Sequence, residues 1–219
     1  MVKGWFLVSS LCLLALAATG IAKADTMFYL TESGQGWAAP TSTLCGGTNC
    51  FGVVDLSQSG SNVNVAVTLT SGVYFVATGN SNSHETFAFN LPSSITTADI
   101  VTPSGWAAGS SGTEAGYGTF SLYEECGTNC TPPGTSTLGS LAFTVDGVTI
   151  SQFGTDNGGT GANYFAADVI DDLIGGNPTG NIADSGPHSP PPVPEPSSLM
   201  LLGMGLTALA GALKLRHLA

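Results

Sequence analysis

The sequence predicts an all-β domain, of β-sandwich or jelly-roll-like form, on three observations. Short apolar runs recur along the chain, several of them alternating with polar residues as in half-buried strands. Gly, Ser and Asn separate these runs, and 30 of the 219 residues are Gly. Helix-forming patterns are scarce, and only 9% of residues are charged. Many short strands with frequent turns are typical of sandwiches and jelly rolls.

Eight segments are predicted to be strands. They are residues 26–30, 51–56, 62–70, 73–78, 85–91, 117–123, 138–145 and 162–170. In the third, Val63, Val65, Val67 and Leu69 lie on one face. Only Ser71-Gly72 separates the third segment from the fourth, which predicts a tight hairpin. One helical turn is expected within 148–153.

The N-terminal residues 1–24 have the features of a signal peptide. Lys3 is the positive residue, the apolar run is 5–18, and Ala22-Lys23-Ala24 places small residues at the cleavage-specifying positions. We therefore expect a mature chain that starts at Asp25. The alternative is an uncleaved membrane anchor. The predicted domain spans 25–173, followed by a Gly/Pro-rich linker at 174–192.

The predicted mature body is acidic. Between residues 25 and 193 there is no Lys or Arg, and 14 of the chain's 15 Asp and Glu lie there. This excludes binding of nucleic acid through its phosphates, which requires Lys and Arg. Anionic polysaccharide would also be repelled unless divalent cations bridged the two.

Four cysteines remain once Cys12 leaves with the signal peptide: Cys45, Cys50, Cys126 and Cys130. An even number in an exported chain indicates disulfides. Gly, Thr and Asn between the cysteines favour the local pairs Cys45–Cys50 and Cys126–Cys130, because these residues form turns. Cross-pairing and a four-cysteine zinc site are the alternatives.

The C-terminal segment has three parts. Val193-Pro-Glu-Pro-Ser-Ser is extended because proline fixes φ. The apolar run 199–213 predicts a single transmembrane helix, and its lack of a polar stripe argues against the alternative of a buried amphipathic helix. Lys214 and Arg216 follow, which places this basic tail in the cytoplasm.

In order, spacing and terminal position, residues 193–219 resemble the PEP-CTERM sorting signal. Proteins with this signal are exported by Gram-negative bacteria that make extracellular polysaccharide. The resemblance implies recognition by exosortase, an inner-membrane protease-transferase. It implies that Pro194, Glu195 and Pro196 are the recognised residues and that the helix and tail are discarded. The expected location is the inner membrane transiently, and then the cell surface or extracellular matrix.

No local catalytic motif is present in the sequence: no Gly-x-Ser-x-Gly, His-Glu-x-x-His or phosphate-binding Gly-Lys loop. Glycoside hydrolysis uses a pair of carboxylates, and Glu124 and Glu125 are adjacent in the sequence, but successive strand residues point to opposite faces. We therefore interpret them as a solvated strand end and expect no enzymatic activity and no cofactor.

Acidic loop residues are weak candidates for a calcium site, because calcium binds carboxylate and carbonyl oxygens. These residues are Asp156, Asp168, Asp171 and Asp172. Their spacing matches neither an EF-hand nor a nonapeptide repeat, and ordinary acidic loops are the preferred interpretation.

Trp37 and Trp106 lie in similar Gly-Trp-Ala-Ala contexts. A loop Trp can stack on a sugar ring or cap the core of a sandwich.

Three hypotheses follow for the function of the predicted mature body. The first is a structural or interaction protein of the polysaccharide matrix. The second is a carbohydrate-binding module that uses these tryptophans. The third is a secreted hydrolase.

Overall fold

The part of the chain that a computed structural model describes is all-β. It comprises residues 25–77, 85–127, 130, 138–154, 157–158, 162–176, 178–188 and Gly205. Residues 24–190 form one compact unit. Among the described residues, short 3-10 helices interrupt the strands at η1 (Thr43–Cys45), η2 (Thr97–Asp99) and η4 (Ile150–Gln152).

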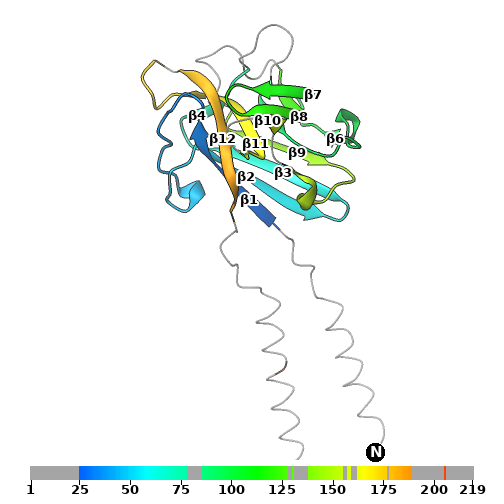
Figure 1. Cartoon of the computed structure of the whole chain (residues 1–219). Coiled ribbons are helices and arrows are strands. Elements are labelled where there is room, and N and C mark those ends of the chain that lie inside the picture. Colours follow the sequence, from blue (N-terminus) through cyan, green and yellow to red (C-terminus); the bar gives the residue numbers. More distant parts are fainter. Residues whose placement is uncertain are drawn as a thin grey trace, which may run out of the picture. The chain divides into compact units, whose positions relative to one another are not determined.

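Twelve strands occur in the described residues (Figure 1). They are β1 (Asp25–Ser33), β2 (Gly52–Ser59), β3 (Asn62–Leu69), β4 (Val73–Phe75), β5 (Phe87–Phe89), β6 (Ile100–Val101), β7 (Trp106–Glu114), β8 (Gly118–Cys126), β9 (Ser140–Val145), β10 (Asn157–Gly158), β11 (Phe165–Asp171) and β12 (Thr179–His188). Each of the eight predicted segments contains one strand. The sequence did not predict β6, β7, β10 and β12. The helical turn expected within 148–153 is η4.

The strands form one continuous sheet. Its order is β10-β8-β5-β11-β12-β1-β2-β3-β9-β6, and β7 pairs with β8 while β4 pairs with β11. The sheet is nearly closed, because the N–H of Phe75 in β4 donates to the carbonyl of Leu138 just before β9 (2.9 Å). The prediction of an all-β domain is therefore confirmed, with hydrogen bonding that runs through a single sheet instead of two separate ones.

The main core lies between the two halves of this folded sheet. Phe89 of β5 and Phe143 of β9 are far apart in strand order, yet their ring centroids are 5.3 Å apart. Phe87 stacks on Phe165 of β11 at 5.7 Å. Fully buried aromatic rings from both halves thus exclude water from the interior, which is the dominant stabilisation of such a fold.

The strand β3 confirms the alternation that the sequence predicts, because Val63, Val65, Val67 and Leu69 are all buried. The predicted hairpin at Ser71-Gly72 is wrong. A turn does occur there, since the N–H of Val73 donates to the carbonyl of Thr70 (2.9 Å). However, β2 and β9 already occupy both edges of β3, so the chain crosses to pair β4 with β11. The hairpin partner of β3 is β2.

The domain boundary expected at residue 173 is also corrected. Residues 174–192 were expected to form a linker, but β12 occupies 179–188 and pairs with β11 on one side and β1 on the other (Figure 1). Its Gly, Asn and Pro content hid this strand. The domain therefore continues to His188.

The terminal segments lie outside the described residues. This applies to the predicted signal peptide 1–24, to the predicted transmembrane helix 199–213 except Gly205, and to the basic residues Lys214 and Arg216. Within the residues that are described, no helix has the length and apolar character needed to cross a membrane.

Candidate functional site

The two ends of the domain leave the sheet side by side. In the β1–β12 pair, Met27 lies opposite His188, and the His188 ring stacks on Tyr29 with centroids 4.3 Å apart. His188 was predicted to lie in a linker; it is the last residue of β12. The predicted mature N-terminus and the sorting segment are thus both attached at one end of the same strand pair.

A buried carboxylate fixes the path of β12. Asp184 is fully buried, and its Oδ1 accepts hydrogen bonds from the N–H groups of Tyr164 (2.8 Å) and Phe165 (2.7 Å). Its Oδ2 accepts from the N–H of Gly186 (2.8 Å). Burial raises the pKa of Asp184 to about 6, and the three N–H donors oppose that shift. The role of Asp184 is structural: it ties β12 to the start of β11.

A second polar cluster lies where β7, β11 and β12 meet. The Asn181 amide donates to Asp168 Oδ1 (2.6 Å) and also to Glu114 Oε2. Glu114 is 2% exposed, and burial together with Asp168 holds its pKa well above the usual range. Glu114 is therefore favoured in its neutral form, which removes its repulsion from Asp168.

Glu124 points into the interior of the domain. It is fully buried, and in the described part of the chain neither carboxyl oxygen has a hydrogen-bond partner. Burial raises its pKa to about 8. Its neighbour Glu125 is partly exposed. The interpretation of both residues as a solvated strand end is wrong for Glu124, because the β8 alternation directs it inward.

The calcium candidates do not assemble around one point. Asp168 and Asp171 are three residues apart on β11 and so face opposite sides of the sheet. Asp171 Oδ1 accepts from the N–H of Leu173 (2.9 Å), and Asp172 is exposed. Asp156 lies outside the described residues. No group of three or more His, Cys, Asp or Glu suited to a metal ion occurs among the residues described.

Both tryptophans pack against the core. Trp106 contacts Phe75 edge to face, with centroids 5.6 Å apart and an interplanar angle of 89°. Trp37 is partly buried against the same main core, and its backbone N–H donates to Ser33 Oγ (3.3 Å). The rings therefore cap the core, which was the alternative to sugar stacking. This geometry gives no support to a sugar platform at these two residues.

The four cysteines form the predicted local pairs. Cys45 is bonded to Cys50, with Cα atoms 6.4 Å apart, and Cys126 to Cys130, with Cα atoms 5.8 Å apart. The Cys45 turn is short enough to close because Gly46, in the left-handed region (φ 65°), follows η1. The structure contains no cross-pair between the two loops.

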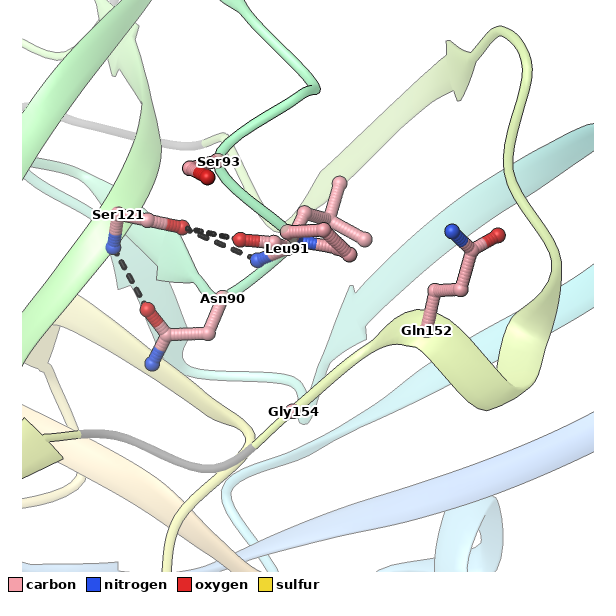
Figure 2. A pocket seen from close by; sticks show the side chains of 7 residues that line it. Asn90, Leu91, Ser93, Ser121, Gln152 and Gly154 are labelled. Atoms are coloured by element: carbon pink, nitrogen blue, oxygen red, sulfur yellow. Dashed lines mark hydrogen bonds between the residues drawn. The ribbon is translucent and has the colours of Figure 1, made fainter.

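A shallow pocket of 410 Å³ lies between the end of β5 and η4 (Figure 2). Asn90 Oδ1 accepts from the N–H of Ser121 (2.7 Å), and Ser121 Oγ accepts from the N–H of Leu91 (3.0 Å). Gln152 Oε1 accepts from the N–H of Thr149. These polar groups join β5 to β8 and cap η4, so they hold the walls of the pocket together. None of the residues predicted to be functional lines this pocket.

The sequence alone did not identify Asp184, Glu114 and Glu124 as buried acids. The one available signal was the position of Asp184 directly after apolar residues, in Ile-Ala-Asp184. Burial of these carboxyls depends on strands distant in the chain.

One comparison with known proteins gave a match. The model of the PEP-CTERM protein-sorting motif matches residues 192–216. No curated protein and no solved structure matched the chain. The matched segment confirms the resemblance seen in the sequence and marks this chain as an exported protein sorted to the cell surface. Because β12 ends at His188, only residues 189–191 separate the folded domain from the matched segment.

Proposed function

We propose that this chain is an exported surface or matrix protein, processed at its C-terminus by an exosortase-type membrane protease. The observation that carries the proposal is the sorting motif at 192–216, directly after the last strand of a folded domain. On this proposal, the motif directs the chain to the cell exterior, and the β domain is the product delivered there.

Each part of the sorting segment has a physical role in the proposed pathway. The apolar run 199–213 enters the inner membrane, and Lys214 with Arg216 stays on the cytoplasmic side. This holds Pro194, Glu195 and Pro196 near the outer surface of that membrane, in an extended conformation that a protease can bind. Cleavage there releases the domain from its helix.

The delivered domain is proposed to have a structural or interaction role in extracellular polysaccharide. Two disulfides and a core of buried aromatic rings suit a domain that works outside the cell. A non-enzymatic role remains our proposal. Glu124 faces the interior while Glu125 faces the other side of the sheet, so this pair does not support hydrolysis. The core packing of Trp37 and Trp106 likewise does not favour binding through these rings.

The test is processing of a Glu195→Gln variant in the native cells. We expect the wild-type chain to lose the apolar run 199–213 and the variant to retain it in the membrane fraction. Pro191→Ala is the matched control, because it changes the same proline-rich stretch outside the matched segment. Equal processing of wild type and Glu195→Gln would contradict the assigned role of the motif.

A further inference from the structure

The outer side of the β7–β8 hairpin carries an aromatic ring that lies flat over glycines. Tyr123 of β8 lies opposite Gly109 of β7. A Cβ atom placed at Gly109 would overlap the Tyr123 ring, and one at Gly112 would lie 3.0 Å from its Cδ1 atom. Two glycines in one strand thus make room for this ring against the β7 backbone. The ring also packs against a second hydrophobic cluster, which includes Ala88, Tyr117 and Phe120.

The ring is on the face of the sheet that points away from the main core. Tyr123 lies opposite Ala88 in the β5–β8 pair. Phe87 and Phe89, on either side of Ala88, both belong to the main core, so Ala88 and Tyr123 face the other way. Tyr123 is only partly buried. Part of the ring therefore covers the β7 backbone and the second cluster, and part of it is exposed to solvent.

Two carboxylates flank this ring. Glu125 is two residues further along β8 and so lies on the same face. Glu85 lies just before β5: its Oε1 accepts from the N–H of Thr113 (3.4 Å), and its Cγ lies beside Gly112. Burial, followed by the charges of Glu85 and then Glu125, raises the pKa of the Tyr123 hydroxyl. The ring thus has one carboxylate two positions along its own strand and a second beside Gly112.

No positive charge of the body neutralises these two groups, because residues 25–193 contain neither Lys nor Arg. An aromatic face attracts a cation placed over it, and carboxylates bind ammonium groups through charge-assisted hydrogen bonds. The combination of ring and paired carboxylates is complementary to a positively charged group. The same charges repel anionic polysaccharide.

We propose that Tyr123, Glu85 and Glu125 bind the free amino groups of an amino-sugar polysaccharide. The protonated amine lies over the Tyr123 ring, and its N–H groups donate to the two carboxylates. This inference rests on the proposed function, since it names the kind of matrix polymer that the exported domain would meet. The three residues together are called the Tyr123 surface below.

The experiment measures binding of a β-1,4-linked glucosamine hexamer by calorimetry, using protein recovered from native cells. The matched probe is the N-acetylated hexamer, which has the same sugar rings without the positive charge. The free-amine hexamer is expected to bind, and the N-acetylated hexamer about tenfold more weakly or not at all. No binding of the free-amine hexamer, or equal binding of the two, would overturn the proposal.

Variants separate the Tyr123 surface from the general acidity of the domain. Tyr123→Ala is expected to weaken binding about tenfold, whereas Tyr123→Phe retains the ring and most of the affinity. Glu125→Gln is expected to weaken binding about fivefold. Asp172→Asn makes the same change in net charge at an exposed residue outside the Tyr123 surface and is expected to leave binding nearly unchanged.

An equal loss of affinity for the free-amine hexamer in Glu125→Gln and Asp172→Asn would show that only net charge matters. It would contradict specific binding at the Tyr123 surface. If Tyr123→Ala does not fold, since the ring also covers Gly109, the comparison of Glu125→Gln with Asp172→Asn still decides the outcome. Processing at the sorting motif is read separately by mass. Failure of amino-sugar binding in a correctly processed protein therefore leaves the proposed function standing.

Discussion

The strands β3 and β12 are both interior strands of one sheet, yet they are held in place by different forces. β3 pairs with β2 and β9, and β12 pairs with β11 and β1. Along β3, every second side chain is a buried Val or Leu. β12 reads Thr-Gly-Asn-Ile-Ala-Asp-Ser-Gly-Pro-His and has one large apolar residue, Ile182, in the core.

The difference shows two ways of fixing a strand. The apolar face of β3 specifies its register by itself, because a shift of one residue would expose all of its valines. β12 is fixed instead by polar contacts to other elements. Asp184 binds N–H groups at the start of β11, and Asn181 joins Asp168 to Glu114 of β7. A strand fixed in this second way has no local pattern that would reveal it.

The largest expected effect comes from removing β12. A chain that ends at residue 173, the boundary that the sequence predicted, lacks β12. Both β1 and β11 then lose the strand that pairs with one of their edges, and we expect this chain not to fold. A chain that ends at Pro190 retains the compact unit and is expected to fold cooperatively. Thermal unfolding followed by circular dichroism distinguishes the two. A cooperative transition in the shorter chain would contradict the account of β12.

The next largest effects are the losses of stability caused by one substitution in β12 and one in β3. Asp184→Ala leaves the N–H groups of Tyr164, Phe165 and Gly186 without their acceptor and is expected to lower the free energy of unfolding by about 4 kcal/mol. Val65→Ala removes two buried methyl groups from β3 and is expected to cost about 2 kcal/mol. Urea unfolding at pH 7 gives both values. A cost for Asp184→Ala below that for Val65→Ala would mean that packing, and not polar contacts, holds β12.

The buried acids predict the direction of pH dependence. The folded-state pKa of Glu124 is raised from 4.5 to about 8 and that of Asp184 from 3.8 to about 6. The folded chain therefore keeps protons that the unfolded chain releases. The stability they contribute is fully present below about pH 4 and is lost as pH rises to about 8. Urea unfolding at several pH values measures this fall.

Glu124→Gln isolates the contribution of one buried acid. The variant is expected to exceed the wild type in free energy of unfolding by about 4 kcal/mol at pH 8 and to match it at pH 4, because Gln cannot ionise. Glu125→Gln is the control on the exposed side of β8. A Glu124→Gln variant with the full pH dependence of the wild type would refute the burial of a neutral carboxyl.

The smallest effect is expected on the outward face of β3. Asn64 accepts a hydrogen bond from Thr144 Oγ1 (3.0 Å) on neighbouring β9. Asn64→Ala is expected to cost less than about 1 kcal/mol, because the site is partly open to water. Urea unfolding compares it with Val65→Ala, the adjacent inward residue. Equal costs would show that the alternation of β3 does not determine its stability.

The fold class, eight of the strands and both disulfides were predictable because their signals are local. Alternating valines mark β3, and Gly, Thr and Asn between cysteines mark the closed loops. β7 and β12 were missed because Gly109, Gly112 and Gly180 weaken the strand pattern. Each of these glycines makes room for a side chain from elsewhere: Tyr123 lies over the first two, and Gln35 lies against Gly180. The requirement for glycine at these positions comes from tertiary contacts, which cannot be predicted from the local sequence.

The sorting segment and the proposed Tyr123 surface also differ in how far the local sequence reveals them. The segment at 192–216 is contiguous, so its order and spacing can be read directly. The Tyr123 surface brings together two residues of β8 and Glu85, which lies just before β5, and Tyr123 had no distinguishing context in the sequence. Trp37 and Trp106 had such a context, and the core accounts for both.

The most direct measurement is the intact mass of the protein recovered from native cells, with both termini sequenced. The account predicts an N-terminus at Asp25 and a C-terminus after His188 and before Leu199, so that β12 is kept and the apolar run is lost. A chain that retains 199–219 would contradict processing at the sorting motif. A chain that ends before Thr179 would contradict a domain completed by β12.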